Sequence, residues 1–261
     1  MHIETRGALE ERMNSLKEEE QQTNFGCQDW LLTEVERLES IFKIIQGLKN
    51  GSTVGVNNVS YKWEIAMGTA AWRIEVPDTD EFIEGKCISP GAKHLQSAYQ
   101  SELVGQLAIL HTIHDICQFH NISSGQLTLA CDDKTTLNMT KFKAVKIVSP
   151  KQKHSDIVGP MVKLRDALKI DVNCVHVTVH QGDWVEYNDL DRLVQMNICM
   201  DLEAKEFMEK ILHQGFKLEA MTAQHLLAFG DLTVDRDYVF NELVHTTYKM
   251  IADKKTLMTL G

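Results

Sequence analysis

The chain has 261 residues, and 27 Lys and Arg against 37 Asp and Glu give it a net charge of −10 at pH 7. Hydrophobic residues make up 43% of the sequence and charged residues 25%, which is typical of a globular protein. The small numbers of Pro (4) and Gly (15), with no repeated period, exclude collagen-like, low-complexity and solenoid architectures. No apolar run approaches the roughly 18 residues of a membrane helix, and residues 1–15 contain no apolar stretch. We therefore expect no signal peptide, no membrane partner and an intracellular location, cytoplasmic or nuclear.

The expected absence of a signal peptide implies a reducing compartment for the six cysteines. All six stand singly and none forms a C-x-x-C pair, so the zinc-knuckle pattern is missing. We expect buried thiols at these positions.

Residues 1–51 predict an acidic lead-in followed by an amphipathic helix. The lead-in contains the run EERMNSLKEEEQQ, for which a solvated face and a regulatory tail are the alternatives. Apolar residues then recur at helical spacing, and the helix is expected to end at Gly47 or Gly51. These residues are Leu31, Leu32, Val35, Leu38, Ile41, Phe42 and Ile45.

The hydrophobic period changes after residue 52 and predicts an α/β domain over residues 52–210. Three short strands are expected within 52–63, 65–76 and 81–89, joined as an antiparallel meander. A long helix should begin near Ser97, with a buried strand at 126–131 after it. A helix at 155–170, a strand at 174–180 and a helix at 189–215 complete the order βββ-α-β-α-β-α. This order predicts a five-stranded mixed sheet flanked by helices, and residues 211–261 predict a helical extension.

A lysine-rich segment stands out in this acidic chain. Residues 134–153 contain six lysines and no acid, including Lys141, Lys143 and Lys146. Such local asymmetry suits a surface that contacts phosphates, and a solvated loop is the alternative.

Three acids occupy positions that a sheet-and-helix domain would cover or place at a strand end. Glu102 lies one turn into the long helix, Asp132 ends the buried strand 126–131, and Asp201 interrupts the last helix. Ligand sites of α/β proteins gather at such strand ends. Each acid alone is also compatible with an exposed helix position or a helix cap.

Together these motifs resemble the ribonuclease H domain of retrotransposon reverse transcriptases, over roughly residues 52–210. The segments that carry the resemblance are GTAAWRIE (68–75), SAYQSELVGQLAIL (97–110), LACDD (129–133), VTVHQGD (177–183) and MNICMDLEAK (196–205). The resemblance implies a ribonuclease H-like fold and two Mg²⁺ ions, which support in-line cleavage of the RNA strand of an RNA–DNA hybrid. It also implies Glu102, Asp132 and Asp201 as metal ligands and His180 as a mobile catalytic histidine. The rest of a reverse transcriptase polyprotein becomes a candidate partner.

The sequence departs from the family at the first catalytic carboxylate. The family has a Ser-Asp-Gly-Ser-like motif on its first strand, whereas this chain has Asn57-Asn58-Val59-Ser60, so Asn58 stands where the aspartate is expected. An amide is neutral and cannot bridge two cations as a carboxylate does, so we expect a degenerate copy with weakened or lost catalysis. Two alternatives stay open: a non-enzymatic module that binds nucleic acid or protein, and a polymerase centre built on Cys131-Asp132-Asp133.

Overall fold

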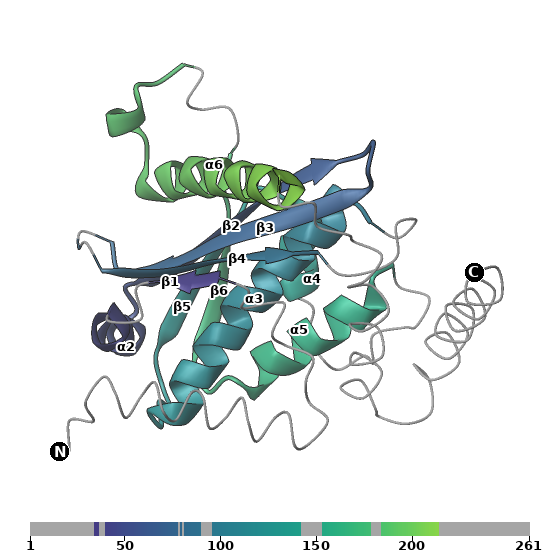
Figure 1. The fold of residues 1–261 in the computed structure, drawn as a ribbon. Helices are drawn as coiled ribbons and strands as arrows, with labels where there is room; N and C mark the ends of the chain where they lie inside the picture. The colour runs from purple at the N-terminus through teal and green to yellow at the C-terminus, as the bar shows by residue number, and fades with distance from the viewer. Residues whose placement is uncertain are drawn as a thin grey trace, which may run out of the picture.

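The computed structural model describes residues 34–36, 40–77, 79, 81–89, 96–141, 153–178 and 184–213. They form one mixed sheet in the strand order β1-β4-β3-β2-β5-β6, with helices on both faces (Figure 1). The predicted fold class and all five predicted strands are confirmed. Most of the lead-in and the extension beyond residue 213 lie outside the described residues.

The sheet follows from the hydrophobic pattern of its strands. β2 (Thr53–Lys62), β3 (Met67–Glu75) and β4 (Phe82–Ile88) form the predicted antiparallel meander. β5 (Gln126–Cys131) runs parallel to β2, and β6 (Asp171–His176) runs parallel to β5. The first six residues of β2 are all buried, because this strand lies inside the sheet and is covered on both faces.

One prediction about the N-terminal helix is wrong. The helix was expected to include Leu31 to Leu38, but Glu34–Glu36 form the edge strand β1, which pairs antiparallel with β4. The helix α2 is shorter, Ile41–Asn50, and ends at Gly51, whose φ of 79° suits glycine. Pairing with the exposed edge of β4 outweighs the helical spacing of the apolar residues in this short segment.

The helices form two layers around the sheet. α3 (Ala98–Phe119) and α5 (Ser155–Ala167) lie on one face, and α6 (Arg192–His213) lies on the other (Figure 1). The predicted start of α3 is confirmed, because the Ser97 hydroxyl accepts a hydrogen bond from Gln100 N. The short helix α4 (Lys134–Thr140) and the 3₁₀ turn Tyr187–Asp189 complete the described elements. None of the helices in the described ranges has the length and apolar character needed to cross a membrane.

The main hydrophobic core lies between the sheet and the α3 face. It joins α2, α3 and α5 to the sheet, with Ile44, Leu48, Trp72 and Leu107 among its buried members. Because α2 shares this core, we propose that the folded unit begins before residue 52.

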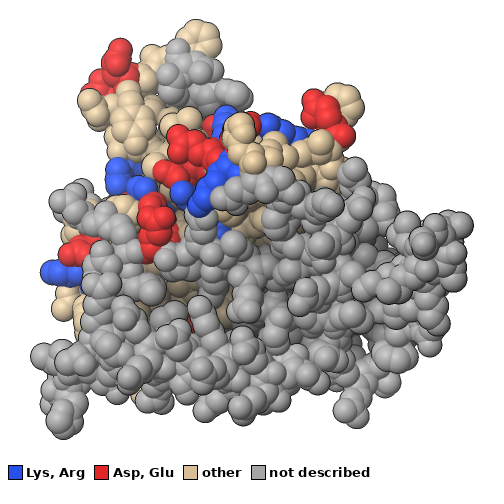
Figure 2. All heavy atoms as spheres, in the orientation of Figure 1, with Lys and Arg blue, Asp and Glu red and all other residues tan. Residues whose placement is uncertain are grey.

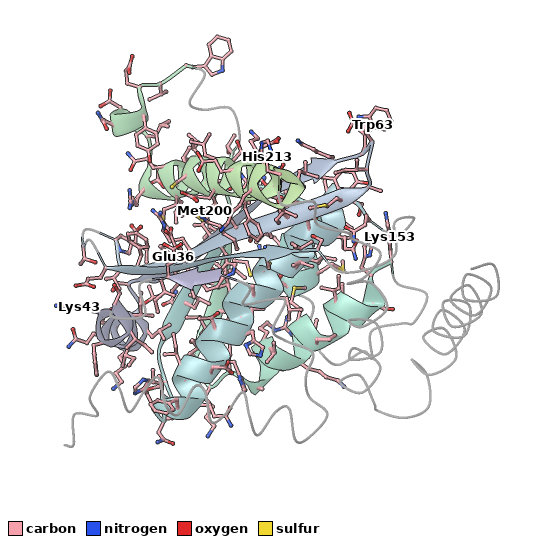
Figure 3. All side chains as sticks on the ribbon, in the orientation of Figure 1. Glu36, Lys43, Trp63, Lys153, Met200 and His213 are labelled. Carbon is pink, nitrogen blue, oxygen red and sulfur yellow. The ribbon has the colours of Figure 1, made fainter. Side chains whose placement is uncertain are left out.

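On the other face, α6 is held by apolar packing and by ion pairs. Met200 packs with Ala71 and Ala204 between α6 and the sheet (Figure 3). Arg192 binds the Glu75 carboxylate through Nε and Nη2, at 2.6 and 2.7 Å. Figure 2 shows basic and acidic side chains interspersed over the coloured part of this view.

Candidate metal and nucleic-acid site

The centre of the site is set by two adjacent asparagines on β2. Successive strand residues point to opposite faces of a sheet, and Asn57 and Asn58 follow this rule. The Nδ2 of Asn57 donates to Glu102 Oε2 on α3 at 2.8 Å, whereas the Nδ2 of Asn58 donates to the Asn197 carbonyl on α6 at 3.1 Å. The pair therefore ties the central strand to both helical layers.

Glu102 is positioned by the first turns of α3. Glu102 is 6% exposed, and α3 places its side chain towards the sheet beside the end of β5. The close approach of α3 to β2 is possible because residue 105 is glycine: a Cβ there would lie 2.8 Å from Asn57 Nδ2. A buried carboxylate is thus brought against the central strand without a basic partner among the described contacts of its side chain.

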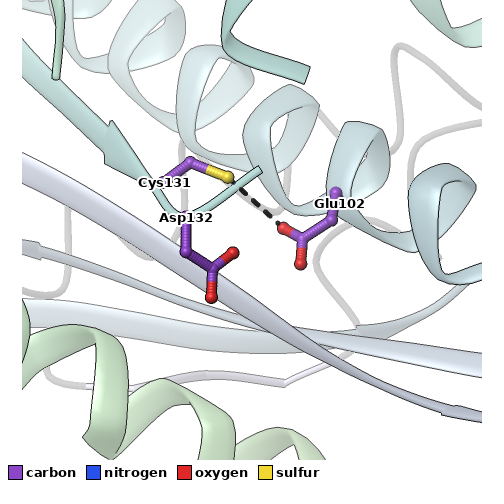
Figure 4. A group of neighbouring side chains, drawn as sticks. All are labelled: Glu102, Cys131 and Asp132. Carbon is purple, nitrogen blue, oxygen red and sulfur yellow. Dashed lines mark hydrogen bonds between the residues drawn. The ribbon is translucent and has the colours of Figure 1, made fainter. Parts of the chain in front are cut away.

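Glu102 meets Cys131 and Asp132 at the carboxyl end of β5 (Figure 4). The thiol of Cys131 lies 3.5 Å from Glu102 Oε2, and one ligand atom from each of the three residues lies within 4.8 Å of the others. Asp132 follows the last residue of β5, so the alternation of side chains between the two faces of the sheet does not fix the direction of its side chain. The structure brings together two of the three predicted metal ligands.

Asp133 has a different role from its neighbour. Its carboxylate caps α4, since Oδ1 accepts from Thr135 N at 2.6 Å and from Thr136 N at 3.4 Å. Asp132 therefore belongs to the carboxylate cluster, whereas Asp133 caps α4. Within the described residues the pair does not form a two-aspartate metal site of the polymerase type.

Asn197 on α6 connects the third element to the cluster. Its Nδ2 donates to Asp132 Oδ2 at 3.3 Å, while its backbone carbonyl accepts from Asn58. The Oδ1 atoms of Asn57 and Asn197 are buried and have no hydrogen-bond partner among the described residues. Two buried amide oxygens next to the two carboxylates therefore accept no hydrogen bond from the described residues.

The electrostatics of the cluster disfavour ionised side chains in the absence of a cation. Burial, and then the nearby charge of Asp132, raise the pKa of Glu102 well above its ordinary value. Burial also raises the pKa of Asp132, against the hydrogen bond from Asn197. Burial and the charge of Glu102 raise the pKa of the Cys131 thiol well above its ordinary value. A bound cation would offset these costs.

The remaining predicted site residues that the structure describes are not part of this cluster. Asp201 lies one turn beyond Asn197 on α6, where its carboxylate pairs with Lys205 at 2.6 Å. The cluster formed by the described residues does not include it. Lys141 is exposed at the C-terminus of α4. His180, Lys143 and Lys146 lie outside the described residues.

Three residues of the site were not anticipated. Cys131 was expected to be a buried thiol and Asn57 was noted only beside Asn58, while Asn197 was not considered. Strand alternation around Asn58 would have indicated that Asn57 faces α3. Helical spacing would have placed Asn197 on the same side of its helix as Asp201.

The donor set does not fit two Mg²⁺ ions. Glu102 and Asp132 carry at most two negative charges, which balance one divalent cation. The Asn58 amide is engaged within the protein, since its Nδ2 donates to the Asn197 carbonyl and its Oδ1 accepts from Val59 N. Mg²⁺ is held by anionic and carbonyl oxygens in near-octahedral geometry. The described residues suit one divalent cation and leave a second without a ligand set.

Comparisons with known proteins were made by sequence and by structure. No protein-family model and no curated protein matches the chain. RNase H1 from the halophilic archaeon Halobacterium salinarum NRC-1 is 10% identical, with 59% of this chain and 97% of that chain covered and a TM-score of 0.38. The N-terminal RNase H domain of a Mycobacterium tuberculosis protein, solved as a fusion with maltose-binding protein, is 15% identical, with 59% and 96% covered and a TM-score of 0.34. Both neighbours are RNase H domains, but likenesses this low carry no argument about the site.

Proposed function

We propose that residues 52–210, together with β1 and α2, which join their sheet and core, form a ribonuclease H-type nucleic-acid-binding domain in which cleavage of RNA–DNA hybrids is strongly weakened or lost. We infer its origin as a degenerate copy of a retrotransposon reverse transcriptase domain, which makes the rest of such a polyprotein a candidate partner. This substrate class suits an intracellular protein.

One observation carries the proposal: Glu102 and Asp132 lie together at the end of β5, directly beside Asn57 and linked through Asn197 to Asn58. Carboxylates from a helix and from a strand end, adjoining the central strand, suit a hydrolase centre for phosphodiesters. Asn58 stands at the sequence position where the family resemblance implies a further carboxylate.

The weakening follows from charge. Two-metal hydrolysis requires both ions to be held so that water is activated and the leaving oxygen is stabilised. Two carboxylates cannot neutralise two divalent ions, and ligands that act as a unit lose most of their effect when one is missing. Asp201 supplies no third carboxylate to the cluster while it pairs with Lys205.

A cleavage assay on a labelled RNA–DNA hybrid in Mg²⁺ tests this proposal. The unmodified chain should cleave slowly or undetectably, and Asn58→Asp should raise the rate, if necessary together with Val59→Gly, which restores the family's glycine. Asp132→Asn provides the negative control. Robust cleavage by the unmodified chain that disappears in Asp132→Asn would overturn the proposed weakening.

The lysine-rich segment is proposed as the nucleic-acid surface. Lys141 lies at the end of a seven-residue helix that begins beside Asp133, so at about 1.5 Å per residue it stands roughly 10 Å from the carboxylate cluster. This distance places it within reach of a backbone bound at the cluster. Lys143 and Lys146 follow directly in the sequence.

Hybrid binding at several salt concentrations tests the surface. Changing Lys141, Lys143 and Lys146 to Ala should lower the slope of log affinity against log salt by about one unit for each phosphate that the variant no longer neutralises. Lys43→Ala/Lys49→Ala on α2 controls for the loss of positive charge elsewhere. If the triple variant bound the hybrid with unchanged affinity and salt dependence, these lysines would not form the nucleic-acid surface.

A second candidate is a binding module without catalysis. It is favoured by the Asn58 amide, whose Nδ2 donates to α6 and whose Oδ1 accepts from Val59 N at 2.7 Å. These bonds suit a structural residue. Hybrid binding by the unmodified chain, without cleavage by any of the variants above, would support this candidate.

A further inference from the structure

The carboxylate cluster contains a sulfur ligand that an oxygen-only Mg²⁺ site would not need. Cys131 is fully buried at the end of β5, and its Sγ lies 3.5 Å from Glu102 Oε2 (Figure 4). Together with Asp132, these residues present one sulfur and two carboxylate groups, with a ligand atom of each within 4.8 Å of the others. The chemistry of the set therefore differs from that of an all-carboxylate centre.

The spacing suits a tetrahedral metal. Zn²⁺ binds thiolate sulfur at about 2.3 Å and carboxylate oxygen at about 2.0 Å, and at a tetrahedral angle these bonds separate the two atoms by roughly 3.5 Å. The Sγ–Oε2 distance of 3.5 Å, across which the thiol donates a hydrogen bond to Glu102, equals this edge. Thiolate also selects soft or borderline cations over Mg²⁺, which prefers oxygen ligands and retains water.

Two buried amides flank the cluster, and each has an unsatisfied oxygen. Asn57 is 0% exposed and Asn197 is 5% exposed, and their amides contact Glu102 and Asp132 respectively. The Oδ1 atom of each is buried without a hydrogen-bond partner among the described residues. Such orphaned acceptors are costly unless a donor or a cation satisfies them.

We propose that Glu102, Cys131 and Asp132 bind a single thiophilic divalent cation such as Zn²⁺, with an asparagine Oδ1 or water as the fourth ligand. Three protein ligands and one replaceable position are the pattern of an open zinc site. The proposal goes beyond the nuclease function, since the ion binds whether or not a hybrid is cut.

Co²⁺ provides a direct probe, because a cobalt–thiolate bond produces a charge-transfer absorption band in the near ultraviolet. The full chain, stripped of metal with a chelator, should develop this band on addition of Co²⁺ and lose it when Zn²⁺ displaces the cobalt. Cys131→Ser should abolish the band and weaken Zn²⁺ binding, measured by competition, at least tenfold. The matched control is Cys199→Ser, which removes a half-buried thiol on α6 that packs with Ala71 and Met200 and should keep the band.

The outcomes separate this proposal from the nuclease proposal. A chain that gives no thiolate band, or a Cys131→Ser variant that keeps it, overturns the zinc site. Zn²⁺ binding that needs Glu102 and Asp132 but not Cys131 would overturn it while leaving the nuclease proposal standing. If Cys131→Ser does not fold, Asp132→Asn decides: loss of the thiolate band supports the site, and a band that remains overturns it.

Discussion

The Nδ2 of Asn58 donates a hydrogen bond of 3.1 Å to the backbone carbonyl of Asn197, 139 residues further along the chain. This bond joins the central strand β2 to α6, and the Asn197 side chain continues it to Asp132. Asn58 is thus a donor at a position where an aspartate could only accept. Asn58 therefore makes a structural contact that a carboxylate at this position could not make.

The Asn58→Asp variant should therefore be less stable than the unmodified chain when no metal is present. It loses the donor and places a carboxylate against a carbonyl oxygen, which should lower the free energy of unfolding by about 1–3 kcal/mol. Urea unfolding in the presence of a chelator measures this change. Asn188→Asp adds the same charge at an exposed position and should have little effect; equal stability of the two variants would contradict the role of the bond.

The raised pKa of Glu102 predicts a pH dependence of the metal-free protein. A carboxyl group whose pKa is higher in the folded than in the unfolded state contributes stability below its unfolded pKa, and this is lost as the pH rises through the folded pKa. Burial, reinforced by Asp132, is the cause. Glu102→Gln should remove this loss, so its free energy of unfolding should exceed that of the unmodified chain by an amount that grows with pH.

Chelator-treated samples unfolded in urea from acid to mildly alkaline pH check this prediction. Glu206→Gln, at an exposed position on α6, serves as the control and should follow the unmodified chain. A Glu102→Gln variant that is less stable than the unmodified chain at the alkaline end would contradict the argument.

The Arg192–Glu75 pair should matter more for stability than the exposed Lys205–Asp201 pair on the same helix. Glu75 has a side chain only 1% exposed and is held by two nitrogens of Arg192. Arg192→Ala leaves this carboxylate buried without its partner, and since the arginine is 43% exposed we expect a loss of about 2–3 kcal/mol, below the range for fully buried pairs. Lys205→Ala breaks an exposed pair on the same helix and should cost under about 1 kcal/mol.

Thermal or urea unfolding distinguishes these two variants. Adding Glu75→Gln to Arg192→Ala should recover part of the stability, because the unpaired charge is removed. Equal losses for Arg192→Ala and Lys205→Ala would show that burial of Glu75 does not decide the strength of the pair.

The contact between α3 and β2 predicts that Gly105 cannot be enlarged without cost. A Cβ there would lie 2.8 Å from Asn57 Nδ2 and 2.9 Å from Asn57 Cβ. Gly105→Ala gains about 1 kcal/mol of helix propensity but crowds the asparagine, for a net loss of about 1–2 kcal/mol. Combining it with Asn57→Ala should relieve the crowding, so the double variant should be more stable than the sum of the single effects; strict additivity would contradict the contact.

The sequence by itself determined the order and type of most elements and the approximate place of the site. The spacing of apolar residues, every second residue in strands and every third or fourth in helices, was sufficient to assign most elements. Both faces of the sheet are covered, so the core-facing positions are apolar. Local capping chemistry placed the start of α3 at Ser97 and allowed the end of α2 at Gly51. The element order and the family resemblance together predicted that Glu102, Asp132 and Asp201 converge, and the structure brings together the first two but not Asp201.

Only the tertiary structure decided which residues complete the site. Helical spacing puts Asn197 and Asp201 on one side of α6, but they stand one turn, about 5.4 Å, apart along its axis. The depth at which α6 docks on β2 and β3 brings Asn197 to Asp132 and leaves Asp201 with Lys205. The strand β1 likewise depends on the exposed edge of β4. A periodic pattern specifies the face of an element, whereas its position along the neighbouring element is set by packing between segments far apart in the chain.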